Sequence, residues 1–177
     1  MINRIIALFL IVFSSLTYSQ VSEEIIVDLH KIPSGTFKRF EWKGFPVFVL
    51  KLTKTQISSV EKNRHQISEK LQQSAFDNLS KSFDAELTNL LIDSTRNKRR
   101  LLKQGIVVLF GVSLESGCMF VVNYNKDHIE DPCTLSKYSL DGRPLKVNDK
   151  YDFSMLIPPY SATENTVTIL RNSEFVE

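Results

Sequence analysis

The chain has 177 residues, which is long enough for one domain that buries its own core. Its 22 basic and 20 acidic side chains leave a formal net charge of +2, which excludes a nucleic-acid binder that depends on bulk charge. A composition of 42% hydrophobic and 24% charged residues is globular, and it excludes a disordered chain, a collagen-like fibre and a multi-span membrane protein.

Residues 1–19 are predicted to be an export signal. Arg4 gives a basic start, residues 5–13 are uninterruptedly apolar, and small and polar residues lead to a predicted cleavage site before Gln20. The apolar run is much shorter than the ~20 residues that span a bilayer, so we prefer cleavage over a retained anchor, through which alone the chain would contact a membrane. The predicted domain, residues 20–177, would then reach a bacterial periplasm by a Sec-type route, where disulfides persist.

The first part of the mature chain is predicted to form short strands. Residues 24–27 (EIIV) favour a strand, and residues 36–42 (TFKRFEW) alternate as a half-buried strand does. A second apolar run over residues 46–52 follows a turn that contains Gly44. Two such runs around a Gly-containing turn predict a hairpin.

Residues 53–104 are predicted to be a helical insert. Apolar residues recur at steps of three and four among polar ones, which is typical of one or two amphipathic helices, with a possible break near residues 74–78. The insert ends in a basic cluster at residues 96–103. We prefer to interpret this cluster as a solvated helix C-terminus, where cations interact favourably with the helix dipole. The alternative is a patch that binds a partner or an anionic lipid.

Strands are predicted to resume after the insert. Residues 105–111 form a fully apolar run, and residues 119–124, 147–157 and 166–170 complete the set. Short strands separated by turn residues predict an all-β sandwich or barrel-like core.

Two segments carry a family resemblance. Residues 111–118 read GVSLESGC, and residues 131–143 read DPCTLSKYSLDGR. Together they resemble the two cluster-binding boxes of the Rieske [2Fe–2S] proteins, especially the iron–sulfur subunit of ubiquinol–cytochrome c reductase, where the boxes read GVCTHLGC and CPCHGSxYDxSGR. Residues 37–52 and 142–169 are similar to flanking strands of that family. The resemblance implies an all-β Rieske-like sandwich or barrel of short antiparallel strands, with residues 53–104 as an α-helical insert.

The same resemblance implies that the cluster ligands are lost. A Rieske centre is held by two cysteine thiolates and two histidine imidazoles. Four oxygen-bearing side chains occupy the matching positions here: Ser113, Glu115, Asp131 and Thr134. Oxygen ligands suit calcium, magnesium or manganese rather than sulfide-bridged iron. Residues 1–19 also lack the twin-arginine motif typical of cofactor-loaded family members, so we expect no cofactor.

The two cysteines of the chain, Cys118 and Cys133, match the non-ligand pair of the family, which forms a disulfide between the two boxes. A disulfide that closes the loop from Cys118 to Cys133 contributes about 3 kcal/mol to the free energy of unfolding. The alternatives are two separate buried thiols, which exported proteins seldom keep, and a catalytic redox pair, for which a C-x-x-C motif and a basic neighbour are lacking. We therefore prefer a structural disulfide.

Four other positions in or near the boxes carry expectations. Ser136 and Tyr138 match the family residues that donate hydrogen bonds to a bridging sulfide and to a ligand thiolate. Leu135 replaces a glycine of the family, so we expect that turn to be rebuilt. His128 matches no ligand position and is expected to be a histidine of a surface loop.

These observations predict a binding protein without catalytic residues, metal or cofactor. We name the surface formed by residues 111–118 and 131–143 the tip. The tip or the helical insert is expected to contact partner proteins in a periplasmic or envelope-associated assembly. Two alternatives remain: an electron-transfer subunit with unorthodox cluster ligation, and a hard-metal site built from Glu115 and Asp131.

Overall fold

The computed structural model describes residues 24–62, 69–146 and 153–170. The predicted signal at residues 1–19 and the first half of the strand expected over residues 147–157 lie outside these ranges. The elements, in chain order, are β1 (Ile25–Asp28), η1 (Leu29–Lys31), β2 (Thr36–Trp42), β3 (Phe45–Lys51), α1 (Lys54–Lys62), α2 (Glu69–Ser82), α3 (Ala85–Asn97), β4 (Ile106–Phe110), β5 (Val121–Asn123), η2 (Tyr124–Lys126), β6 (His128–Glu130), β7 (Lys137–Ser139), β8 (Tyr160–Ala162) and β9 (Thr166–Ile169).

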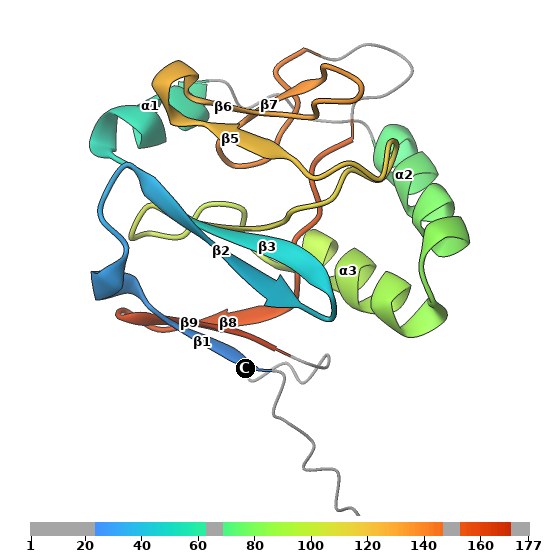
Figure 1. Cartoon of the computed structure of the whole chain (residues 1–177), viewed down its shortest axis with the longest axis horizontal. Coiled ribbons are helices and arrows are strands. Elements are labelled where there is room, and N and C mark those ends of the chain that lie inside the picture. The colour runs from blue at the N-terminus through green and yellow to red at the C-terminus, as the bar shows by residue number, and fades with distance from the viewer. Residues whose placement is uncertain (1–23, 63–68, 147–152, 171–177) are drawn as a thin grey trace, which may run out of the picture.

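The strands of the described ranges form three antiparallel sheets of three strands each, in the orders β1-β9-β8, β2-β3-β4 and β5-β6-β7. The β2-β3-β4 sheet lies between the other two, with β1, β8 and β9 below it and β5, β6 and β7 above it in Figure 1. The all-β fold with a helical insert, predicted from the sequence, is confirmed.

The middle sheet is covered on both faces. Every residue of β4 is buried, as its uninterrupted apolar sequence predicts for a strand with two covered faces. Alternate side chains enter two apolar clusters because successive residues of a strand point to opposite faces. Val49 and Val108 belong to the cluster shared with α2, α3 and the β1-β9-β8 sheet, whereas Phe48 and Leu109 face the β5-β6-β7 sheet.

The predicted hairpin is confirmed as β2 and β3, which pair from Thr36 opposite Lys51 to Trp42 opposite Phe45. Its two turn residues, Lys43 and Gly44, both have positive φ, at 49° and 79°. A two-residue turn with both φ angles positive matches the twist of the strands it joins.

The helical insert is confirmed, but its described residues form three helices instead of one or two, and the possible break near residues 74–78 is absent. α2 continues through that range to Ser82, and Asp84 begins α3 by accepting a hydrogen bond from the Leu87 N–H at 2.8 Å. The physical signal for the helix start is therefore the capping aspartate and not a gap in the apolar pattern. Side chains of both helices, including Leu79 and Leu91, enter the core, so the insert packs against the sheets.

The strand expected over residues 147–157 is also wrong in its described part. Residues 154–157 are buried, but residues 153–157 join no sheet, because N–H groups of this segment bond to separate parts of the chain. The Met155 N–H donates to the Gly142 carbonyl at 2.8 Å, and the Ile157 N–H donates to Thr95 Oγ1 at 2.9 Å. Two prolines follow and cannot donate to a ladder.

The strand expected over residues 119–124 is shorter in the structure, where β5 spans Val121–Asn123. The other two strands of its sheet, β6 and β7, have three residues each and were not predicted. Among the described residues, no helix is long and apolar enough to cross a membrane.

Asp84→Ala should lower the free energy of unfolding by about 1 kcal/mol, because it removes the N-cap of a helix whose apolar face is part of the core. Urea denaturation measures the change. Asp93→Ala is the matched control, since Asp93 is exposed within α3 and alanine has the higher helix propensity. An equal loss of stability in both variants would contradict a specific capping role.

Candidate functional site

The tip consists of two loops that a disulfide joins. The first loop links β4 to β5 and the second links β6 to β7, and Cys118 bonds to Cys133 with the two Cα atoms 6.4 Å apart. The first loop is also closed on itself, because the Ser113 N–H donates to the Cys118 carbonyl at 2.9 Å. The disulfide preferred from the sequence is thus present in the structure.

A buried carboxylate holds the same two loops together. Asp131 is fully buried, and its Oδ1 accepts hydrogen bonds from the N–H groups of Cys133 at 2.9 Å and Thr134 at 3.3 Å. Its Oδ2 accepts from the Ser116 hydroxyl of the other loop at 2.9 Å. The Asp131 side chain therefore shapes its own loop and ties it to the first loop.

The hydrogen bonds decide the charge state of Asp131. Burial favours the neutral acid and by itself raises the pKa. Hydrogen bonds donated by Ser113, the Cys133 N–H, Ser116 and Thr134 outweigh this effect and lower the pKa of Asp131 below its ordinary value. The group is consequently a carboxylate at neutral pH, and its charge strengthens the bonds that it accepts.

The structure brings three of the four positions matched to cluster ligands together. Ser113 is buried and, like Thr134, is hydrogen-bonded to Asp131. The Thr134 hydroxyl also donates to Ser136 Oγ at 3.0 Å. Glu115 differs from the other three, because its side chain is exposed. The sequence predicted these four residues as a set, but only the structure separates the exposed member.

Ser136 and Tyr138, the matches to the family's hydrogen-bond donors, contact neighbouring residues of the tip. Ser136 accepts from Thr134, and its backbone carbonyl accepts from the Asp131 N–H at 2.9 Å. Tyr138 is buried on β7, where its ring packs edge-on against Phe120 with the ring centres 5.3 Å apart. These two residues fix the second loop and the strand that follows it.

The residues at the tip do not fit a [2Fe–2S] cluster. Such a cluster needs thiolate or imidazole ligands, and both cysteines of the chain are in the disulfide. The four positions matched to cluster ligands carry oxygen instead of sulfur or imidazole nitrogen, so we derive no redox step for this chain.

The atoms at the tip do not converge on a hard cation either. In the part of the chain that the structure describes, three ligand atoms from histidine, cysteine or carboxylate side chains come within 4.8 Å of one another only at Cys118, Asp131 and Cys133. Two of these atoms are the disulfide sulfurs, and both oxygens of Asp131 accept hydrogen bonds. Glu115 is not part of the group, so the geometry does not favour the Glu115–Asp131 metal site considered from the sequence.

His128 is not in a surface loop, and that expectation is wrong. It lies buried on β6, opposite Asn123 and Ser139 in the neighbouring strands. Its Nδ1 lies 3.1 Å from the Lys126 carbonyl oxygen and its Nε2 lies 3.2 Å from Glu130 Oε2. A strand of three residues gives too short an alternation to be recognised from the sequence.

Leu135 has a left-handed backbone with φ of 62°, and its N–H donates to the Asp131 carbonyl at 2.8 Å. Glycine adopts this conformation without cost, whereas a residue with a Cβ atom does not. Leu135 is therefore a bulky residue in a conformation that favours glycine, and the rebuilt turn expected from the resemblance stays a prediction.

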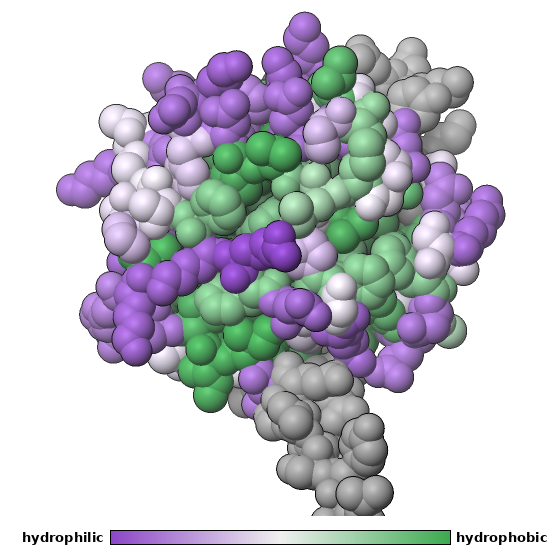
Figure 2. Space-filling model, viewed as in Figure 1, coloured by the Kyte–Doolittle hydropathy of each residue, from purple (hydrophilic) through white to green (hydrophobic). Residues whose placement is uncertain are grey.

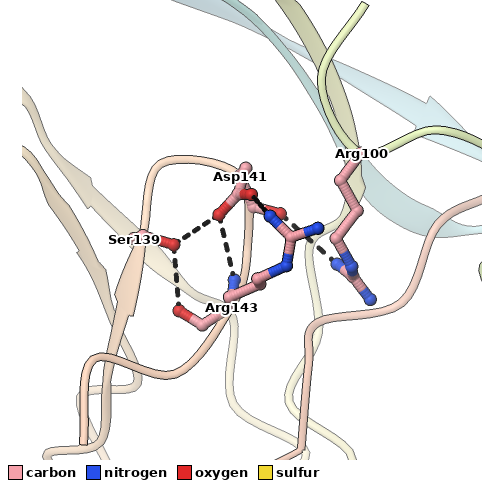
Figure 3. A network of polar contacts seen from close by, with 4 residues as sticks. All are labelled: Arg100, Ser139, Asp141 and Arg143. Carbon is pink, nitrogen blue, oxygen red and sulfur yellow. Dashed lines mark hydrogen bonds and ion pairs between the residues drawn. The ribbon is translucent and has the colours of Figure 1, made fainter. Parts of the chain in front are cut away.

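A second polar network, missed in the sequence, lies at the base of the tip (Figure 3). The fully buried Asp141 pairs with the Arg143 guanidinium and accepts a short hydrogen bond from the Ser139 hydroxyl. Arg100, which follows α3, donates to the Asp141 backbone carbonyl at 3.3 Å. The Asp-Gly-Arg sequence at residues 141–143 was seen only as part of a family box, and nothing in it indicated a contact with Arg100.

Comparison with known proteins adds a sequence relationship. No family model matches the chain. The chain is 26% identical over 152 residues to the mitochondrial Rieske subunit of the cytochrome b-c1 complex from Theropithecus gelada, and equally to that from Chlorocebus aethiops. Each match covers 83% of this chain and 45% of the relative, so the chain spans less than half the length of these curated relatives. This weak similarity supports a Rieske-like protein.

Solved structures give looser similarities. A chain of a hyperthermophilic respiratory Complex III shares 18% identity at a TM-score of 0.46, covering 87% of this chain and 78% of its own. The ferredoxin of carbazole 1,9a-dioxygenase from Nocardioides aromaticivorans shares 8% identity at a TM-score of 0.41, covering 82% and 93%.

Asp131→Asn should lower the free energy of unfolding at pH 7 by about 2 kcal/mol, because it removes the charge that strengthens buried hydrogen bonds between the loops. The folded pKa of Asp131 lies below the unfolded value of about 3.9, so the stability from this charge is present above that pH and is lost as the pH falls through the folded pKa. Urea denaturation at pH 7 and at pH 3 should therefore show a smaller loss on acidification in the variant than in the wild type. Equal losses in the two proteins would contradict the charged state of Asp131.

Proposed function

We propose that this chain is an exported, cluster-free Rieske-fold protein that acts by binding, without catalysis. Its tip would dock on a partner protein in a periplasmic or envelope-associated assembly. The observation that carries the proposal is the conformation and exposure of Leu135.

Leu135 is a strained residue without a packing reward in the described part of the fold. The left-handed conformation costs a residue with a Cβ atom about 1–2 kcal/mol. Its side chain is nevertheless 68% exposed, so burial within the chain does not offset the cost. A strained backbone that presents a large apolar side chain to solvent is typical of a functional contact.

The tip is rigid enough to present this side chain in one geometry. The disulfide fixes the distance between the two loops, and Asp131 accepts hydrogen bonds from both. A contact surface that is ordered before binding loses less conformational entropy on association. The disulfide and the hydrogen bonds to Asp131 therefore suit the tip to a docking role.

Other exposed apolar side chains adjoin the tip. Met119 directly follows Cys118 and is 44% exposed, and Val121 on β5 is exposed as well. Figure 2 shows apolar groups on this side of the molecule, over β2 and β5, with hydrophilic side chains among them. The apolar residues of the insert, by contrast, enter the core, which favours the tip over the insert as the contact surface.

The sequence relatives point to a role within an assembly. They are described as the Rieske subunit of the cytochrome b-c1 complex, which is a protein built of several chains. The predicted signal at residues 1–19 supports export, and the lack of fit to a cluster supports binding over electron transfer.

Leu135→Asn should abolish partner binding while leaving the fold intact or more stable by about 1 kcal/mol, because asparagine tolerates the left-handed conformation and carries no large apolar group. Ile26→Asn is the matched control: Ile26 is 71% exposed on β1, which lies at the end of the molecule away from β6 and β7 in Figure 1. Urea denaturation measures the stability of both variants.

The contact itself is tested with a photo-crosslinking amino acid placed at position 135 or at position 26 in cells that express the full chain. A discrete protein adduct is expected from position 135 and not from position 26, and Met119→Asn should weaken it. Adducts of equal yield from both positions, or none from position 135, would show that the tip is not the docking surface.

A further inference from the structure

A cavity of about 500 Å³ opens where the helical insert meets the base of the tip. Thr95 lies near the end of α3, and residues 98–101 follow that helix directly. Arg143 contributes from the segment after β7. The cavity thus combines two parts of the chain that are far apart in sequence, and its volume is that of a small-molecule site.

The lining of this cavity is strongly cationic. Among the described residues it contains four positively charged side chains and no acidic one: Lys98, Arg99, Arg100 and Arg143. The interpretation of the basic cluster as a solvated helix C-terminus fits Arg96, which lies in the last turn of α3. Its guanidinium lies over the Phe76 ring and donates a hydrogen bond to the Gln73 side chain at 2.8 Å. The same interpretation does not fit residues 98–100, which line the cavity.

Asp141 is the one carboxylate of the polar network, and it does not balance the charges of the three arginines in the lining. Asp141 is fully buried beneath the cavity and pairs with Arg143, while Arg100 reaches only its backbone carbonyl. Figure 3 shows the guanidinium groups of Arg100 and Arg143 side by side next to Asp141. The carbonyl end of α3 adds about half a negative charge at most, which leaves a clear positive excess.

The environment of Arg100 shows the same imbalance. Burial lowers the pKa of Arg100 to about 10, Asp141 opposes this effect, and the nearby Arg143 lowers the pKa further. The group remains protonated at neutral pH, so a charge is held with incomplete compensation. Arg100 is half-buried in the cavity lining, where a bound anion would add a charged partner to the Asp141 carbonyl that it already contacts.

We propose that this cavity binds a phosphate monoester through Arg99, Arg100 and Arg143. Guanidinium groups match the oxygens of a phosphate with two parallel hydrogen bonds, and a doubly charged anion suits several converging cations better than a single carboxylate does. The volume exceeds the needs of a bare phosphate, and Leu101 offers apolar contact to the organic part of the ester. The site is separate from Leu135 and does not depend on the docking role of the tip.

The proposal is tested by calorimetric titration of the full-length protein with glycerol 3-phosphate and with inorganic phosphate, each against sodium chloride of the same ionic strength. The two phosphate ligands should bind, and glycerol 3-phosphate should bind more tightly. Arg99→Gln should weaken binding at least fivefold, and it should leave the fold intact, since Arg99 is exposed and the hydrogen bond from Tyr160 goes to its backbone carbonyl. Arg99→Gln combined with Arg100→Gln should abolish it.

Lys38→Gln combined with Lys103→Gln is the charge-matched control, because both lysines are exposed and neither lines the cavity. It should change the affinity less than twofold. Sedimentation with phosphatidylcholine vesicles, with and without phosphatidate, separates a lipid phosphate from a soluble ester, and loss of binding in the Arg99/Arg100 variant supports the site in either case. The proposal is overturned if none of these phosphates binds, or if the control variant loses as much affinity as the cavity variant.

Discussion

The two loops of the tip depend on one arrangement: a buried aspartate carboxylate beside a disulfide. Asp131 accepts hydrogen bonds from its own loop and from Ser116 of the other, while Cys118 and Cys133 bond covalently a few residues away. A buried carboxylate is costly without such donors, so the loop conformations and the charge support each other. The family resemblance predicts the disulfide between the two loops, whereas the hydrogen bonds that Asp131 accepts from both loops are visible only in the structure.

The sequence predicted well those strands that are long enough to show a hydrophobic pattern, above all where a recognisable turn adjoins them. β2 and β3 combine alternation with a two-residue turn, and β4 is a continuous apolar run. β6 and β7 have three residues each, too few for a period to be visible, and residues 153–157 look like a strand because burial, not pairing, determines their composition. The start of α3 was marked in the sequence by Asp84, a capping residue that the apolar pattern alone does not show.

The candidate site was predicted through family resemblance, and the residues by themselves would not have assembled it. The pairing of Cys118 with Cys133 came from the matched boxes, as did the set to which Asp131 belongs. The cationic cavity was out of reach because a run of basic residues does not reveal which of them turn inward. Its formation depends on Arg143, which only the folded chain brings next to Arg100. A run of basic residues in the sequence thus indicates a positively charged surface, but the tertiary contacts determine whether these residues line a cavity.

The central claim is that this Rieske-like chain works without a cluster, and one set of measurements on the purified full-length protein tests it most directly. The absorption spectrum is recorded, and iron, acid-labile sulfide and free thiols are assayed on the same sample, prepared from an oxidising compartment. We predict a colourless protein without iron or sulfide and without titratable thiols, because both cysteines are in the disulfide. Stoichiometric iron and sulfide with visible absorption bands would contradict the account and return the protein to the electron-transfer class.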